Sequence, residues 1–106
     1  MGRFVIVAYK PKPGKAEGLT AAVEKHLRVL RSENLVTEAP ANVMHAADGT
    51  VIEVFEWSSS EAIAKAHASP AVQELWGEFA TVCEYVPLAS LSEAQQMFAE
   101  FESVSL

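Results

Sequence analysis

Histidines are the side chains of this sequence best suited to move a proton near neutral pH. His67 follows Ile63 by four residues, which places it on or beside the apolar face of a predicted helix. There it could take a proton from an acidic phenol or orient one by hydrogen bonding. The alternative is a structural histidine that bonds the helix backbone. His26, between Lys25 and Leu27, is predicted to lie on the surface.

Two glutamates, Glu53 and Glu56, lie in a predicted strand, where successive side chains point to opposite faces. One of the two must therefore point toward the buried side of the sheet. A buried carboxylate needs a partner or has a raised pKa, so this glutamate is a candidate general base. The other interpretation is an ion pair with Arg3 or Lys10 of a second chain.

Aromatic side chains and one further histidine could bind a flat small molecule. The rings could stack on such a ligand and tyrosine hydroxyls could orient it, although aromatic residues at strand and helix spacing also build cores. His45, near the end of a predicted strand, is either part of the same pocket or exposed to solvent. The candidate substrate-binding residues are Tyr9, His45, Phe55, Trp57, Trp76 and Tyr85.

Other kinds of site find little support in the sequence. The single cysteine, Cys83, has no partner and is predicted to be a buried structural thiol. No pair of His, Glu or Asp side chains has convincing ligand spacing for a metal. Nucleophilic triads, phosphate loops and dinucleotide motifs are missing. We therefore predict neither a metal nor a cofactor.

The composition is that of one globular domain, residues 1–106, because half of the side chains are apolar and charge is moderate. A net charge of −6 repels phosphate backbones, so nucleic-acid binding is not expected. The apolar runs are far shorter than the roughly 20 residues needed to cross a bilayer, and no basic-then-apolar leader opens the chain. We expect a cytoplasmic protein without membrane segments.

The elements that must position these residues follow from periodicity and turn signals. Apolar residues at helical spacing predict helices over 16–32 and from about 58–60, the second opened by a capping box of Ser58 and Glu61. Ser69-Pro70 should divide the second helix. Strands are predicted over 3–10, 35–47 (irregular at Pro40), 50–57 and 83–89, with a hairpin turn at Asp48-Gly49 and a short helix from Ser92.

This order predicts an α+β fold of the ferredoxin-like type, β-α-β-β-α-β, with a four-stranded antiparallel sheet and helices on one face. The first and third strands carry apolar residues at both alternating positions, so both faces are built for burial. A second copy of the sheet is the economical cover, which predicts a homodimer. Residues 91–106 form a predicted C-terminal helix and tail that could reach the partner subunit.

A loop and two later stretches carry a family resemblance over residues 3–90. The loop is Lys-Pro-Gly-Lys at residues 12–15, and the stretches are FEWSSSEA at 55–62 and His67-Ala68-Ser69-Pro70. In this order, with a hairpin before the later two, the chain resembles the antibiotic biosynthesis monooxygenase-like domains of the dimeric α/β barrel superfamily.

The resemblance implies a dimeric α/β barrel with a small-molecule pocket. That family includes cofactor-independent quinone-forming oxygenases, haem-degrading enzymes, isomerases and proteins of no known activity. We therefore expect a cofactor-independent monooxygenase that acts on an aromatic, quinol-like molecule, with His67 and either Glu53 or Glu56 as catalytic candidates. The alternative is a non-catalytic barrel that binds a small ligand or responds to stress.

The sequence also departs from the family's patterns. Ala71 stands where many members that resemble quinol oxygenases have a second histidine after the Ser-Pro pair. The first strand lacks the asparagine of the haem-degrading members. Their Trp and His pair lies ten residues apart in one helix, whereas Trp57 and His67 are ten apart but Trp57 is predicted to end a strand.

Overall fold

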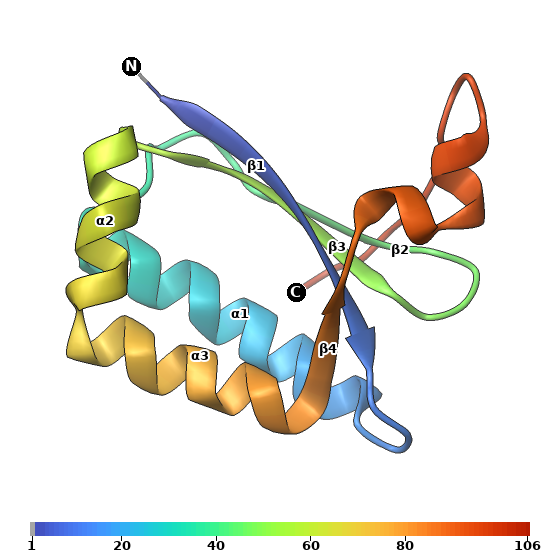
Figure 1. Ribbon diagram of the computed structural model, residues 1–106, viewed down its shortest axis with the longest axis horizontal. Helices are drawn as coiled ribbons and strands as arrows, with labels where there is room; N and C mark the ends of the chain where they lie inside the picture. The colour runs from blue at the N-terminus through green and yellow to red at the C-terminus, as the bar shows by residue number, and fades with distance from the viewer. Residues whose placement is uncertain (1) are drawn as a thin grey trace.

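Across residues 2–106, which the computed structural model describes, the chain forms one open sheet of five antiparallel strands with three α-helices on one face (Figure 1). Met1, the first residue of the predicted domain, lies outside them. The α+β class is thus confirmed. The elements are β1 (Arg3–Pro11), α1 (Ala16–Ser32), β2 (Asn42–His45), β3 (Val51–Trp57), α2 (Ser60–Ala68), α3 (Pro70–Val82), β4 (Cys83–Val86) and β5 (Glu102–Ser103).

The strands lie in the order β4-β1-β3-β2-β5, so the two longest apolar strands form the centre of the sheet. The register pairs Val5 with Phe55 and Tyr9 with Val51. Side chains alternate along each strand, so Val5, Val7 and Tyr9 share the face that the helices cover. The intervening residues of β1 belong to the opposite face, which we call the outer face.

Helix α1 has the predicted bounds, and its buried stripe packs on the sheet. The predicted break at Ser69-Pro70 is also confirmed: the Ser69 hydroxyl accepts a hydrogen bond from the Val72 amide at 3.4 Å, and Pro70 opens α3. The capping box of Ser58 and Glu61 is wrong. Ser59 caps α2 by accepting from the Ala62 amide at 3.0 Å, while the Ser58 hydroxyl donates to a carbonyl elsewhere.

Three strand predictions need correction. The strand predicted over 83–89 ends at Val86, because Pro87 has no amide hydrogen to donate to the sheet. The predicted strand over 35–47 is regular only in β2. Before β2 the chain makes a single bridge at Val36 and then an irregular segment, in which Pro40 has no amide hydrogen to donate to the sheet. The sheet has five strands, and the prediction of four is wrong. The fifth, β5, pairs with β2 through Met44 and His45 and covers its edge.

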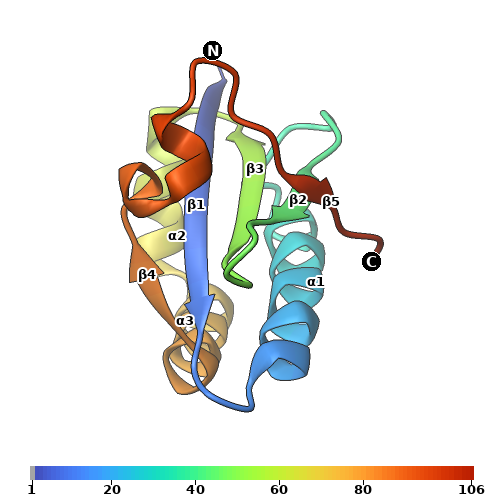
Figure 2. The same cartoon turned by 90° about the vertical axis from the view of Figure 1, so that its right-hand side faces the viewer.

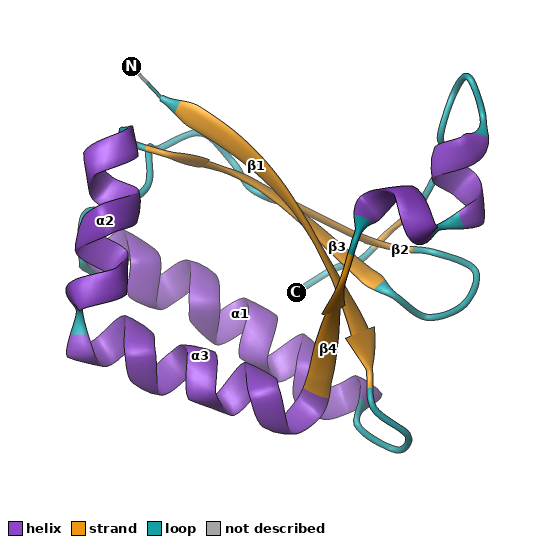
Figure 3. Cartoon of the chain, viewed as in Figure 1, coloured by secondary structure: helices purple, strands orange, loops and turns teal. Residues whose placement is uncertain are grey.

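The helix predicted from Ser92 is only a single short 3-10 helix, one of the two short helical pieces that follow β4 in Figure 3. The segment makes two 3-10 helices, Leu88–Ser90 and Ser92–Gln95, and then runs to β5 without regular structure. Helices are stabilised mainly by packing an apolar side, and Met97 and Phe98 are 92% and 80% exposed. The segment's apolar contacts come instead from Leu91, Ala94 and Phe101, which lie against the sheet.

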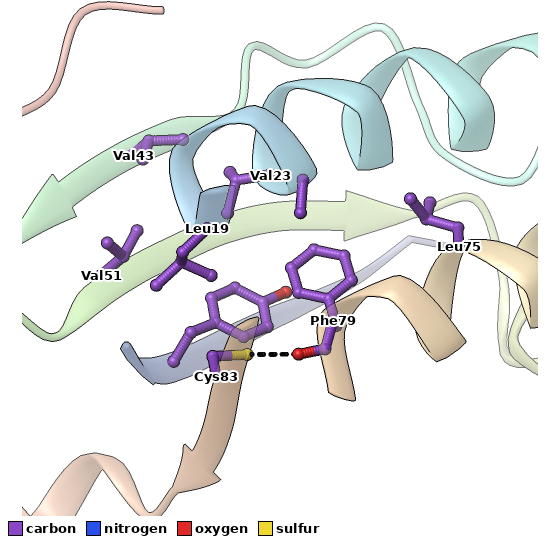
Figure 4. Packing of buried hydrophobic residues seen from close by; sticks show 9 residues of the cluster. Leu19, Val23, Val43, Val51, Leu75, Phe79 and Cys83 are labelled. Atoms are coloured by element: carbon purple, nitrogen blue, oxygen red, sulfur yellow. Dashed lines mark hydrogen bonds between the residues drawn. The ribbon is translucent and has the colours of Figure 1, made fainter. Parts of the chain in front are cut away.

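The main core fills the space between the helices and the sheet (Figure 4). The ring of Tyr9 stacks on Phe79 with centroids 4.9 Å apart, and both rings are buried. The Cys83 thiol is buried beside them and donates to the Phe79 carbonyl at 3.3 Å, as expected for a structural thiol. Its burial raises the pKa of the Cys83 thiol.

On the outer face the C-terminal segment covers only part of the sheet, as Figure 2 shows. Leu91 packs with Ala8 and Ile52 there, and all three are buried. Toward the start of β1, Phe4 and Ile6 stay 67% and 51% exposed. None of the helices in residues 2–106 combines the length and apolar character needed to cross a membrane.

Candidate functional site

A pocket of about 470 Å³ lies between the helix-covered face of the sheet and the helices. Strands β1, β3 and β4 and all three helices contribute side chains to it, and most of them are aliphatic or aromatic. This size and character suit a small, largely apolar molecule. The lining residues are Val5, Val7, Tyr9, His26, Phe55, Trp57, Ile63, His67, Trp76 and Tyr85.

Three buried polar side chains form what we call the Glu53 network, in which Tyr9 and His26 line the pocket and Glu53 lies behind them. The Tyr9 hydroxyl donates to Glu53 Oε1 at 2.6 Å. His26 Nδ1 lies 3.1 Å from Glu53 Oε1 and 3.2 Å from Oε2. Glu53 is fully buried, and Tyr9 and His26 are 2% and 3% exposed. A carboxylate in this position is tolerated because both neighbours are hydrogen-bond partners.

The network also controls the protonation of Tyr9. Burial, the charge of Glu53 and the hydrogen bond to it raise the pKa of Tyr9 far above its ordinary value. Tyr9 therefore stays a neutral hydroxyl at any ordinary pH, hydrogen-bonded to Glu53. Its role in the pocket is that of a fixed donor and wall, because its proton is already committed to Glu53.

The walls and mouth of the pocket are aromatic. Phe55 and Trp57 pack edge to face with centroids 5.2 Å apart, and His67 lies in a similar arrangement against Trp76 at 5.0 Å. His67 and Tyr85 are exposed, so they stand at the rim. Partial burial raises the pKa of Tyr85, so this hydroxyl is also neutral near pH 7.

Six of the residues predicted from sequence meet in this pocket. Of the two glutamates, Glu53 is the one on the buried side, and its partners are Tyr9 and His26 rather than Arg3 or Lys10. Glu56 points to the outer face, where it accepts from the Thr37 hydroxyl at 2.9 Å. The predicted residues that line the pocket are Tyr9, Phe55, Trp57, His67, Trp76 and Tyr85.

His45 is not among the lining residues of the pocket. It ends β2, which lies beyond β3 from β1, and its Nε2 lies 3.3 Å from a carboxylate oxygen of Glu102 in β5. The strand-end interpretation of His45 therefore holds, with the side chain 40% exposed. The fifth strand, which the sequence did not reveal, supplies its partner.

His26 is the functional candidate that sequence reasoning missed. The prediction of a surface position is wrong, because the ring is buried against Phe55 and Phe79 at centroid distances of 5.6 and 5.3 Å. A signal was present: Leu19, Val23 and Leu30 share one face of α1, and position 26 lies two turns beyond Leu19 on that face.

No group of three or more His, Cys, Asp or Glu side chains within residues 2–106 is arranged to hold a metal ion. The polar side chains that line the pocket are Tyr9, His26, His67 and Tyr85. Two imidazoles line it, one at the bottom and one at the rim.

Comparison of the chain with models of protein families, with curated proteins and with solved structures finds no match in any of the three. The site itself is therefore the basis for a functional assignment.

Proposed function

We propose that this chain is a cofactor-independent monooxygenase of the antibiotic biosynthesis monooxygenase type, which acts on an electron-rich, quinol-like aromatic molecule. The observation that carries the proposal is the aromatic-walled pocket of about 470 Å³, in which imidazoles are the groups able to accept a proton. A flat phenol would stack on rings such as Trp57 and Trp76 and present its hydroxyl to an imidazole.

The proposed chemistry needs only oxygen and the substrate. Removal of the phenol proton gives an anion whose ring carbon forms a bond to O₂, and the resulting peroxide takes up a proton. Cleavage of its O–O bond with loss of the ring hydrogen releases water and leaves a carbonyl. Phenol and O₂ thus become quinone and water: the substrate is oxidised by O₂, one atom of which enters the quinone. The substrate anion supplies the electrons, so the protein's task is to bind, orient and deprotonate.

Two catalytic candidates differ in their availability. His67 is exposed at the rim and no described residue bonds its ring nitrogens, so it can exchange protons with solvent and substrate. Glu53 already accepts from Tyr9 and lies against His26, so its oxygens are engaged. Direct proton transfer to Glu53 is therefore the less suitable route, and Glu53 acts through its partners.

The proposal includes the ferredoxin-like arrangement and a homodimer in which two sheets pack through their outer faces, as in a dimeric α/β barrel. Phe4 and Ile6 support it, because burying their exposed parts would gain a share of the roughly 1.5 to 3 kcal/mol that full burial of such a side chain contributes. A contiguous apolar patch of this kind is a common mark of an interface. Sedimentation at micromolar concentration should give a dimer, and a monomer would refute this part.

A second candidate function is a non-catalytic barrel that binds a small ligand. One observation favours it: the most deeply buried acid of the pocket is fully satisfied by its own chain, as in a structural network. In that case the aromatic pocket would hold a ligand unchanged.

Oxygen consumption by the purified protein, measured across a panel of hydroquinones and polycyclic phenols, tests the proposal. We expect uptake with at least one substrate and quinone as product, with a reduced rate in His67→Ala. His45→Ala is the matched control, since that histidine lies outside the pocket. No uptake across the panel, together with ligand binding, would favour the non-catalytic barrel.

A further inference from the structure

The second nitrogen of His26 is the unexplained polar atom of the pocket. Nδ1 faces the carboxylate of Glu53, so Nε2 lies on the other side of the ring. Nε2 has no hydrogen-bond partner among residues 2–106. It is also not fully enclosed, because the one fully enclosed side-chain atom without a partner in these residues is Thr50 Oγ1. His26 lines the pocket. Nε2 is therefore open to the cavity, although the side chain as a whole is only 4% exposed.

The position of Glu53 determines which nitrogen carries the proton. A carboxylate only accepts hydrogen bonds, so Nδ1 at 3.1 and 3.2 Å from its oxygens must be the protonated nitrogen. The neutral imidazole then has its lone pair on Nε2, directed away from Glu53. The same carboxylate stabilises the imidazolium that forms when Nε2 accepts a proton.

The surroundings of His26 strengthen this arrangement. Glu53 from β3 and Tyr9 from β1 are the titratable groups of the network, and Tyr9 stays neutral. Phe55 and Phe79 pack edge-on against the imidazole and prevent it from turning. His67 and Tyr85, the other titratable side chains that line the pocket, stand at the rim. The orientation of His26 is thus fixed by packing and by hydrogen bonds, as a proton acceptor requires.

We propose that His26 is the proton acceptor of the pocket, positioned by Glu53, and that the pocket selects molecules with an acidic hydroxyl, a phenol or an enol. Proton transfer to Nε2 leaves the ligand as an oxyanion hydrogen-bonded to the imidazolium, with Glu53 behind it. The choice of a phenol rests on the proposed function. The proton transfer does not require oxygen, and it can be tested apart from turnover.

His67 provides the contrast within the same pocket. Its neighbour is the ring of Trp76 rather than a carboxylate, and solvent reaches it. Nothing fixes its tautomer or stabilises its charged form as Glu53 does for His26. In this arrangement His67 passes protons between the rim and solvent, and the ionisation of the bound molecule depends on His26.

The test uses 4-nitro-1-naphthol, whose neutral and ionised forms absorb at different wavelengths, at a pH below the ionisation of the free probe. Wild-type protein should bind it as naphtholate. His26→Asn keeps an N–H near Nδ1 for Glu53 but has no acceptor at Nε2, so naphtholate binding should weaken roughly tenfold or more. His45→Ala, a histidine outside this pocket, is the matched control and should retain the naphtholate absorption.

Glu53→Gln separates a positioning role from a structural one. A glutamine amide can donate to Nδ1 and so moves the imidazole proton to Nε2, which removes the acceptor while His26 remains. The naphtholate absorption should disappear while far-ultraviolet circular dichroism is unchanged. Nitrogen NMR of the wild-type protein should also show the proton of neutral His26 on Nδ1, a measurement that needs no variant.

Three outcomes would overturn the proposal: no naphtholate bound to wild-type protein, naphtholate retained in folded His26→Asn, or a neutral His26 with its proton on Nε2. Failure of the oxygenase proposal gives a different pattern. The naphtholate absorption would then depend on His26 as expected, while no phenol in the panel would consume oxygen.

Discussion

Both faces of the sheet bury apolar residues, but only the helix-covered face also encloses a polar network and a pocket. The helix-covered face encloses the buried, hydrogen-bonded Glu53 network and an aromatic pocket with His67 and Tyr85 at its rim. The outer face of the central strands offers Phe4, Ile6, Ile52 and Val54, and the chain's own C-terminal segment covers only part of it. The side chains on which the proposed chemistry depends thus lie on one face, while the other face presents apolar side chains.

The largest expected effect is on stability and separates the faces directly. Phe79→Ala removes a fully buried ring that stacks on Tyr9, and should lower the free energy of unfolding by about 3 to 5 kcal/mol. Phe4→Ala, on the outer face, should change it by about 0.5 kcal/mol or less at concentrations where the chain is monomeric. Urea unfolding measures both. Equal losses would show that the outer face is as well packed as the core.

Glu53→Leu should come next, with a loss of about 3 kcal/mol, because it leaves the Tyr9 hydroxyl and His26 Nδ1 buried without their partner. Adding Tyr9→Phe should recover part of this loss by removing one unpaired group. Glu56→Leu, on the opposite face of the same strand, is the control and should cost less. Thermal and urea unfolding are the measurements, and a stabilised Glu53→Leu protein would contradict a network of satisfied polar groups.

Ile6→Glu tests whether the outer face is an interface. A charge at this position would have to be buried in the proposed dimer, so association should weaken at least about tenfold while the fold is retained. Sedimentation across a concentration series measures the association. Lys25→Glu, at an exposed ion pair with Glu78 on the helical side, should leave it unchanged. Equal association of Ile6→Glu and wild-type protein would exclude this face.

Ser69→Ala should have a smaller effect, about 1 kcal/mol, because it removes the cap at the start of α3. The helix break supports both Trp76 and the rim of the pocket, so ligand affinity should fall slightly with stability. Ser69→Thr keeps the hydroxyl and is the matched control. Unfolding in urea gives the stability difference, and an unaffected Ser69→Ala protein would show that the break is set by Pro70 alone.

The smallest expected effect is a pH dependence outside both faces, at the hairpin turn. The Thr50 amide donates to Asp48 Oδ1 at 2.9 Å and lowers the pKa of Asp48 in the folded state. The ionised Asp48 therefore stabilises the folded state above its unfolded-state pKa. This stabilisation is lost as pH falls through the folded-state pKa of Asp48. Asp48→Asn keeps the acceptor without the charge, so its stability should decline less steeply in acid, by about a few tenths of a kcal/mol. Parallel acid-unfolding curves would contradict this.

Local signals made much of the fold predictable. The bounds of α1, the hairpin at Asp48-Gly49 and the break at Ser69 depend on side chains a few residues apart, and Gly49 has the positive φ of 91° that such a turn requires. The fifth strand and the 3-10 helices depend on contacts between segments far apart in the chain. Propensity does not encode these contacts, so they could not be predicted.

The site was predictable in part for the same reason. Alternation along β3 places one of Glu53 and Glu56 inside, but only the packed structure shows that Glu53 is the one, with His26 as its partner. His26 was assigned by its immediate neighbours in sequence rather than by its position on the apolar stripe of α1. The partner of His45 could not be predicted, because it lies in β5, a strand that the sequence does not indicate. Pairings between distant elements decided each of these cases.

The buried Cys83 thiol is a built-in probe of local opening of the fold. The thiol lies at the junction of α3 and β4, closed in by the main core, so an alkylating reagent can reach it only when the helices lift from the sheet. The rate of labelling in native protein thus counts these openings directly. Tyr9 belongs to the same core cluster, so a ligand bound against it should lower the rate of Cys83 labelling. That rate would report occupancy of the pocket without any catalytic assay.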